Sequence, residues 1–197
     1  MDPDELLITR WRSGNAEAAR TLVQRHYPRM FKLLYRLSGT RDQAEELTQE
    51  LFARLTRRVS VSDKEVSNLQ AWLYRAALNL WRDWVRREIY AREKGIKGSN
   101  ADIQDVPAPD AVEPAALERW LRDAVRAAIL ELDPQYREVL VLCYYQGLTS
   151  AEVAKLLGVP PGTVRSRTHY AIKQLRERLG PAAEGGKEPW LKPGNRN

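Results

Sequence analysis

Apolar residues recur every three or four positions along most of this 197-residue chain, and strict alternation of apolar and polar residues is almost absent. A period near 3.6 residues is typical of amphipathic helices, whereas strands show a period of two. We therefore expect an all-α protein. The pattern predicts helices over residues 4–13, 16–38, 40–58, 69–91 and 115–132, then one from 134 to 145 and two more within 147–179.

Cap and breaker residues support several of these boundaries in the first half of the chain. Asn15 can cap the second helix and Gly39 can end it, while Pro28 is expected to kink or break it. Thr40 followed by Gln43 has the spacing of a capping box and would open the third helix.

The third and fourth helices differ in their polar faces. The third has an apolar stripe and, on its other side, Glu46, Gln49 and Glu50. The fourth follows a polar loop at 60–68 and has a wide apolar stripe with a mainly basic reverse face. The stripes comprise Ala44, Leu47, Thr48, Leu51, Phe52 and Leu55, and then Leu69, Trp72, Leu73, Ala76, Ala77, Leu80, Trp81 and Trp84. The basic face comprises Arg75, Asn79, Arg82 and Arg86. One acidic and one basic face suggest two partners.

Periodicity disappears between residues 94 and 114, where Gly, Pro, Ser and Asp accumulate. This segment is expected to be an extended linker, and residues 181–197 a disordered tail with Trp190 as a possible anchor. We therefore expect two small helical domains, 1–93 and 115–180. The formal net charge of +6 is distributed over two basic lobes around this acidic connector, which makes a polyanionic partner plausible for each lobe.

Residues 147–179 predict a helix-turn-helix. Thr149 and Glu152 have the spacing of a capping box, and Gly158 can supply the left-handed residue that ends the first helix. Pro160 and Pro161 fit only the first turn of the second helix. That helix has an apolar stripe and an opposite face whose residues can contact bases or phosphates: Thr163, Arg165, Ser166, Arg167, His169, Tyr170, Lys173 and Arg176. The alternative is an amphipathic helix whose polar face is simply solvated. The cap residues, the proline start and the basic face all agree in register, which favours a helix that reads DNA.

Composition narrows the class further. Cys143 is the single cysteine, which excludes a disulfide framework and a multi-cysteine metal site and is expected to be a buried thiol. The two histidines lack ligand spacing, and we expect neither a metal nor a cofactor. The acidic N-terminus is unlike a signal peptide, and no apolar run approaches the roughly 20 residues of a membrane span. We expect a cytoplasmic protein without membrane insertion.

Three segments in this order resemble the extracytoplasmic function (ECF) group of sigma factors within the sigma-70 family. Residues 39–52 look like the helix of sigma region 2.2, residues 71–87 look like regions 2.3–2.4, and residues 132–178 look like region 4. The resemblance covers most of residues 5–179. It implies a bacterial RNA polymerase specificity subunit, not an enzyme, that is associated with the nucleoid when in the holoenzyme.

The resemblance also implies roles for individual residues. Region 2 would bind the β′ clamp of core RNA polymerase through Glu46, Gln49 and Glu50, with the β flap as a further contact. Region 4 would read the −35 element through Arg165, Ser166 and their neighbours. Regions 2.3–2.4 would capture and melt the −10 element, with Trp72, Asn79 and the 60–68 loop near the unpaired strand. Phosphate contacts are expected from the basic residues of this helix, Arg75, Arg82, Arg86 and Arg87. The family commonly works with an anti-sigma factor, which makes one a possible partner.

The chain departs from the family pattern at Tyr170, where the family often has an arginine, so the −35 preference cannot be transferred. The 60–68 loop also lacks an aromatic residue that could stack a flipped −10 base. Trp72, Trp81 and Trp84 are candidate stacking platforms, but all three lie on the apolar stripe, and core packing is the competing interpretation.

Two rival functions remain at this stage. A stand-alone helix-turn-helix regulator would have the same recognition helix and would bind duplex DNA as a dimer without polymerase. An enzyme acting on nucleic acid would need a metal site, but Glu45, Glu46 and Glu50 lack the Asp or His that would complete one.

Overall fold

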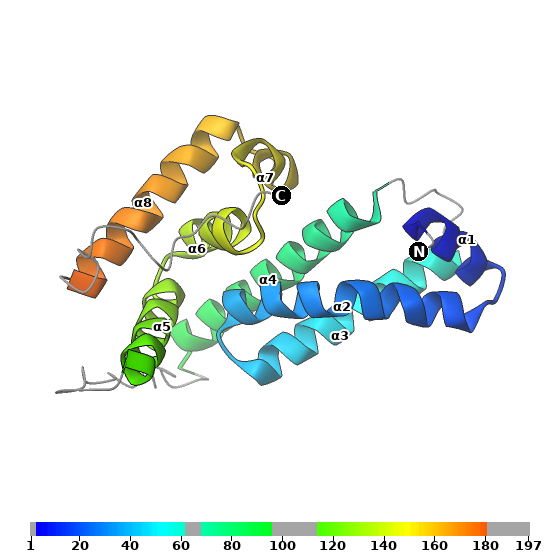
Figure 1. Ribbon diagram of the computed structural model, residues 1–197, viewed down its shortest axis with the longest axis horizontal. Helices are drawn as coiled ribbons and strands as arrows, with labels where there is room; N and C mark the ends of the chain where they lie inside the picture. Colours follow the sequence, from blue (N-terminus) through cyan, green and yellow to red (C-terminus); the bar gives the residue numbers. More distant parts are fainter. Residues whose placement is uncertain (1–2, 62–67, 96–113, 181–197) are drawn as a thin grey trace. The chain divides into compact units, whose positions relative to one another are not determined.

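The computed structural model describes residues 3–61, 68–95 and 114–180, and every regular element in these ranges is helical. The chain divides into two compact units, Met1–Asp83 and Trp84–Asn197, and helix α4 continues across the boundary. Figure 1 shows the helices of each unit. The expectation of an all-α protein is confirmed.

The first unit is built from α1 (Asp4–Arg12), α2 (Ala16–Ser38), α3 (Arg41–Val61) and the start of α4 (Leu69–Glu93). Helices α1 and α3 both pack against α2. The caps of α2 are those that the sequence predicts. The Asn15 side chain accepts a hydrogen bond from the Ala18 amide at 3.0 Å, and Gly39 ends the helix in the left-handed region at φ 90°.

Pro28 does not break α2, so the expected break was wrong. Proline deprives the Gln24 carbonyl of its helical partner. Both side chains are exposed, however, so water can hydrogen-bond that carbonyl. Residues on either side of Pro28 also anchor the helix. Leu22 and Met30 are fully buried, and the Arg25 and His26 side chains both bind Asp4 of α1, at 2.6 and 2.8 Å.

The boundaries of α3 and α4 differ in detail from those expected. Helix α3 continues to Val61, so the first residues of the expected loop are helical. Only half of the predicted capping box forms, because Thr40 Oγ1 accepts from the Gln43 amide at 3.4 Å while the Gln43 side chain turns to Glu46. Asn68 caps α4 instead of ending a loop, accepting from the Ala71 amide at 2.8 Å. Residues 62–67 lie outside the described ranges.

The core of the first unit centres on Trp81, which is fully buried. Its indole N–H donates to the Leu37 carbonyl at 3.1 Å and so joins α4 to α2 near the end of α2. Tyr74, about two turns earlier, is also buried, and the Arg29 guanidinium lies 5.4 Å from its ring centroid. The predicted stripe of α3 is buried throughout. Core packing is therefore the correct interpretation of Trp81.

The second unit contains α5 (Pro114–Leu130), α6 (Pro134–Leu140), the π-helix η1 (Val141–Tyr145), α7 (Ser150–Leu157) and α8 (Pro161–Leu179). Pro134 occupies the first helical position as expected, but the Asp133 side chain forms no cap hydrogen bond. The expected helix to Tyr145 widens into η1 over its last turn. The linker and tail predictions fall on 96–113 and 181–197, outside the described residues.

Arg137 closes the turn between α5 and α6. Its guanidinium donates to the carbonyls of Leu130 and Leu132, which the end of α5 leaves without helical partners. Burial lowers the pKa of Arg137 to about 10, against an opposing effect of Asp133, and the group remains charged at neutral pH. A charged cap thus fixes the angle at which α6 leaves α5.

Replacing Trp81 by phenylalanine tests the core of the first unit. Trp81→Phe removes the bond to Leu37 and leaves a small cavity, so the free energy of unfolding should fall by about 1–3 kcal/mol. Urea unfolding followed by circular dichroism measures this change. Trp84→Phe, at a half-buried position, is the control and should cost less; equal losses for the two variants would contradict the assignment.

Candidate DNA-reading and polymerase-binding surfaces

The helix-turn-helix has the caps that the sequence predicts. Thr149 Oγ1 accepts from the Glu152 amide at 3.3 Å, and the Thr149 amide donates to Glu152 Oε2 at 2.7 Å. These hydrogen bonds stabilise the ionised form of the Glu152 side chain and so lower its pKa. Gly158, at φ 70°, ends α7, and Pro160 and Pro161 stand at the N-cap and first position of α8.

Helix α8 is anchored along one side. Val164, Ala171 and Leu175 are buried, and α8 packs against α5, α6 and α7. Each buried Val or Leu side chain contributes about 1.5–3 kcal/mol relative to exposure. Arg178 adds an ion pair at 3.0 Å with Glu131, the residue that follows α5. The position of α8 in this unit is therefore set by its apolar side, which leaves the opposite side for a ligand.

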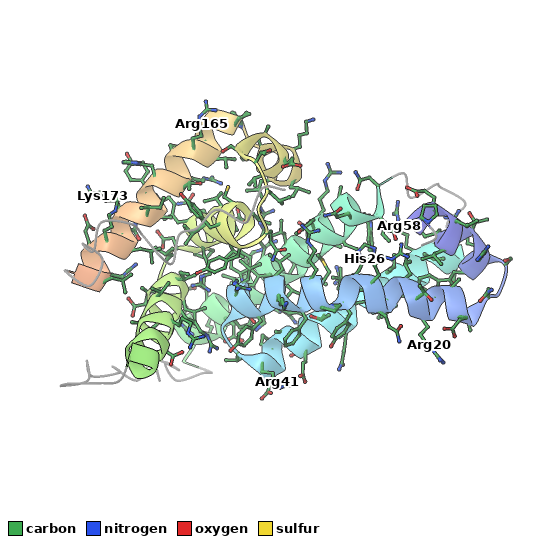
Figure 2. The ribbon with its side chains drawn as sticks, in the orientation of Figure 1. Arg20, His26, Arg41, Arg58, Arg165 and Lys173 are labelled. Atoms are coloured by element: carbon green, nitrogen blue, oxygen red, sulfur yellow. The ribbon has the colours of Figure 1, made fainter. Side chains whose placement is uncertain are left out.

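The opposite side of α8 carries the predicted −35 residues. Arg165, Ser166, His169, Tyr170 and Lys173 are exposed, while Thr163 and Arg167 are half-buried at its edges. Figure 2 shows Arg165 and Lys173 along the outer side of the helix, turned away from α6. Lys173 lies 3.9 Å from Glu177, a weak pairing of two exposed groups. The side chains most exposed for contact are thus cationic or hydrogen-bonding.

Tyr136 is a member of this region that sequence reasoning missed. Its ring on α6 lies 6.3 Å, centroid to centroid, from the ring of Tyr170. No spacing rule links a residue on one helix to another 34 positions later, so only the packing of α6 on α8 reveals the pair.

The predicted −10 residues occupy one helix, α4. Arg75, Asn79, Arg86 and Arg87 are exposed, and Arg82 is half-buried. The spacing of Arg75, Asn79, Arg82 and Arg86 puts them on one stripe of α4, as the sequence predicts. Such a stripe can contact successive phosphates while Asn79 offers both donor and acceptor to a base edge.

Trp72 has a more defined environment than the sequence indicates. It is half-buried at the start of α4, and the guanidinium of Arg58, near the end of α3, lies 5.6 Å from its ring centroid. A cation over an aromatic ring is attracted by the ring's quadrupole. Trp84 is also half-buried. Of the three tryptophans considered for stacking, Trp81 is excluded by its complete burial.

The acidic face of α3 is less acidic than its sequence implies. Glu46 and Gln49 are exposed, but Glu50 Oε1 accepts from Arg54 at 2.8 Å and from Arg57 at 3.1 Å. The hydrogen bond from Arg54 is the main reason that the pKa of Glu50 is lowered. Glu46 therefore provides an acidic group without an ion pair to either arginine.

An aromatic ladder on α2 contacts α3, and sequence reasoning missed it. The ladder consists of Tyr27, Phe31 and Tyr35, one turn apart, whose neighbouring centroids are 6.3 and 6.1 Å apart. Tyr27 also stacks on Phe52 of α3 at 5.7 Å. All three ladder side chains are half-exposed. The spacing of four residues was visible in the sequence, but their partial exposure was not.

The structure also bears on the cysteine, on metal binding and on membrane insertion. Cys143 lies in η1 and is half-buried, and burial raises the pKa of its thiol. Among the described residues, no cluster of three or more His, Cys, Asp or Glu side chains could hold a metal ion. The helices in the same ranges include none that is both long and apolar enough to span a membrane.

Comparison with protein families matches each unit separately. The family described as "Sigma-70 region 2" matches residues 22–89, and "Sigma-70, region 4" matches residues 122–175. The first range includes α3 and most of α4, with the candidate −10 residues. The second includes all of α6–α7 and the candidate −35 residues of α8.

Named relatives cover nearly the whole chain. The ECF RNA polymerase sigma factor SigW of Bacillus subtilis is 30% identical over 178 residues, which are 87% of this chain and 94% of SigW. SigL of Mycobacterium tuberculosis is 34% identical over 82% of this chain and 89% of SigL. SigE of Mycolicibacterium smegmatis is 40% identical over 80% of this chain, which spans only 60% of SigE.

Two solved structures have the same fold. CnrH, in complex with the cytosolic domain of CnrY, matches with a TM-score of 0.62 and 24% identity over 90% of this chain and 97% of CnrH. The sigma factor RpoE from Bartonella quintana, in complex with the anti-sigma factor NepR, matches with a TM-score of 0.58 and 21% identity over 85% of this chain and 98% of RpoE.

Two helical units, one of which presents an exposed basic helix within a helix-turn-helix, are typical of DNA-binding proteins that act in transcription. The chain belongs to the ECF RNA polymerase sigma factors of the sigma-70 family, with region 2 and region 4 domains. Sigma factors are non-catalytic subunits that bind core RNA polymerase and direct transcription initiation. This membership removes both rivals, the stand-alone regulator and the nucleic-acid enzyme.

Glu152→Gln tests the capping box through its pH dependence. Because the pKa of Glu152 is lowered by bonds to Thr149, the stabilisation is present above the ordinary carboxyl pKa and is lost as pH falls through the lowered value. At pH 7 the variant should be about 0.5 kcal/mol less stable than wild type in urea unfolding, and at about pH 3 the difference should vanish. A difference that is equal at both pH values would contradict this role; Glu177→Gln is the control.

Proposed function

We propose that this sigma factor positions RNA polymerase at promoters by reading the −35 element with α8 and capturing the −10 element with α4. Residues 1–93 would form region 2, residues 94–114 an acidic linker, residues 115–180 region 4 and residues 181–197 a tail. One observation carries the proposal: α8 buries its apolar side against α5, α6 and α7 while Arg165, Ser166 and Lys173 face outward.

The −35 contact follows from the chemistry of this outer side. Arginine can donate two hydrogen bonds to the O6 and N7 acceptors of guanine in the major groove, and each such pair discriminates by about 1–3 kcal/mol. Arg165 stands in the first turns of α8, the part of a recognition helix that meets base edges. Lys173 and Arg167 lie further along and are better placed for phosphates.

The −10 contact requires separated strands. The exposed arginines of α4 would hold the backbone, and Asn79 would offer its amide to the edge of an extruded base. The exposed part of the Trp72 ring would provide the stacking surface, while the Arg58 guanidinium lies over one face of that ring. Together these groups provide backbone attraction, edge recognition and stacking, the three requirements for holding an unpaired strand.

The polymerase-binding surface would combine the exposed face of α3 with the aromatic ladder of α2. Interfaces are enriched in tyrosine and phenylalanine at their centre, with polar groups at the rim. The ladder touches α3 through the Tyr27–Phe52 stack, and Phe52 lies three residues after Gln49 on that helix. The β′ clamp is the proposed partner there, and the β flap a further contact of the subunit.

Regulation by an anti-sigma factor is proposed from the solved relative RpoE, whose structure contains one. Such a partner would cover surfaces that core polymerase or promoter DNA needs. The site of action would be the bacterial cytoplasm, at the nucleoid when the subunit is in the holoenzyme.

Arg165→Ala tests the −35 contact. Loss of one bidentate base contact should reduce transcription from a promoter selected by the wild-type holoenzyme by about 10- to 100-fold, while binding to core polymerase is unchanged. Transcription in vitro and co-elution with core polymerase measure the two effects. Arg20→Ala removes an exposed cation from α2 and is the control. Unchanged transcription by Arg165→Ala would refute reading by α8.

Glu46→Lys tests the polymerase-binding surface, and it is preferable to Glu50→Lys because the Glu50 carboxylate is engaged by two arginines. A reversed charge at the rim should weaken core binding by about tenfold or more through like-charge contact. Competition between variant and wild type for core polymerase measures the change. Glu17→Lys, at an exposed site of α2, provides the matched charge reversal; equal effects of the two substitutions would show that α3 has no special role.

A further inference from the structure

Tyr170 is exposed on α8, but one side of its ring is supported. The Tyr136 ring lies 6.3 Å away at an interplanar angle of 42°, and the His169 ring meets it edge-on at 6.0 Å. Half of the Tyr170 side chain remains accessible, with an exposed fraction of 52%. Within the described part of the chain, its hydroxyl forms no hydrogen bond. A ring supported on one side therefore presents an available donor to solvent.

The position of Tyr170 along α8 indicates what this donor would meet. It lies nine residues after Pro161, the first residue of α8, which corresponds to ~13 Å of helix. The major groove is about 12 Å wide, and the first turns of a recognition helix occupy it. A residue at this distance stands at the rim of the groove, beside the sugar-phosphate backbone and not beside a base.

We infer that Tyr170 donates a hydrogen bond from its hydroxyl to a DNA backbone phosphate, and that Tyr136 is a positioning residue that holds the Tyr170 ring for this contact. The inference rests on the proposed reading of the −35 element by α8. The Tyr136 ring of α6 lies next to the Tyr170 ring, where it would disfavour rotamers that turn Tyr170 toward α6. Binding then needs less side-chain ordering, which increases affinity without a further contact.

The salt dependence of this contact differs from that of a contact made by arginine, the residue that the family often has at this position. A neutral hydroxyl releases no counterion from DNA, whereas each arginine on a phosphate steepens the dependence of log affinity on log salt concentration by ~0.9. Tyr170 thus adds affinity that is insensitive to salt. Because a phosphate has no base identity, the added affinity is also the same for different −35 sequences.

The test uses the full chain in holoenzyme with bacterial core polymerase and a promoter duplex that the wild-type holoenzyme selects from randomised DNA. Tyr170→Phe keeps the ring and removes the donor. It should weaken binding by about three- to tenfold, equally on duplexes with altered −35 bases and with an unchanged salt slope. Tyr170→Arg should restore affinity at low salt and raise the slope by ~0.9. Wild-type affinity for Tyr170→Phe would overturn the phosphate contact.

A double-mutant cycle tests the positioning role. Tyr136→Phe keeps the ring and should bind as wild type, while Tyr136→Leu should lose about as much affinity as Tyr170→Phe. In the Tyr170→Phe background, Tyr136→Leu should cause little further loss. An equal loss in both backgrounds would overturn the positioning role, because it would show that Tyr136 acts without Tyr170. Unfolding by urea verifies that each variant is folded.

Arg165→Ala in the same assay separates this inference from the function on which it rests. If Arg165→Ala binds as wild type, α8 does not read the promoter, and both the proposed function and this inference are wrong. If Arg165→Ala loses binding while Tyr170→Phe keeps it, the proposed function stands and only the Tyr170 contact is refuted.

Discussion

The contact between the apolar side of α8 and the three helices behind it is the constraint on which the proposed DNA reading depends. The cations of α8 do not stabilise it as an isolated helix, because like charges along one helix face repel each other. Burial of Val164, Ala171 and Leu175 holds α8 in place in spite of this repulsion. The same burial sets which residues face outward, so an apolar contact determines the polar surface.

Much of this arrangement could be predicted from sequence because it is local. The capping box of α7, the left-handed Gly158 and the proline start of α8 each follow from residues within four positions of one another. The apolar stripe of α3 was predicted correctly for the same reason, since one helical period defines it. Family resemblance then assigned the roles that local rules cannot supply.

The parts that the sequence did not predict depend on contacts between distant residues. Pro28 is tolerated because Asp4, on another helix, binds the residues before it and because water reaches the carbonyl that it leaves open. Arg137 closes the α5–α6 turn through two backbone carbonyls, and Tyr136 reaches Tyr170 only when α6 packs on α8. Residue spacing along a single helix contains none of this information.

The pairing of Glu50 with Arg54 and Arg57 has a consequence for how the subunit would leave a promoter. The Glu50 carboxylate is compensated by these two guanidinium groups within α3, so it adds little negative field to this face. The adhesion of this face to polymerase would then depend on Glu46 and on apolar area, and ions screen the apolar part weakly. The proposed DNA contacts of α4 and α8 place cations against a polyanion, and that attraction fades as ions accumulate. Rising ionic strength would therefore detach the promoter first, and the subunit would depart still bound to its polymerase.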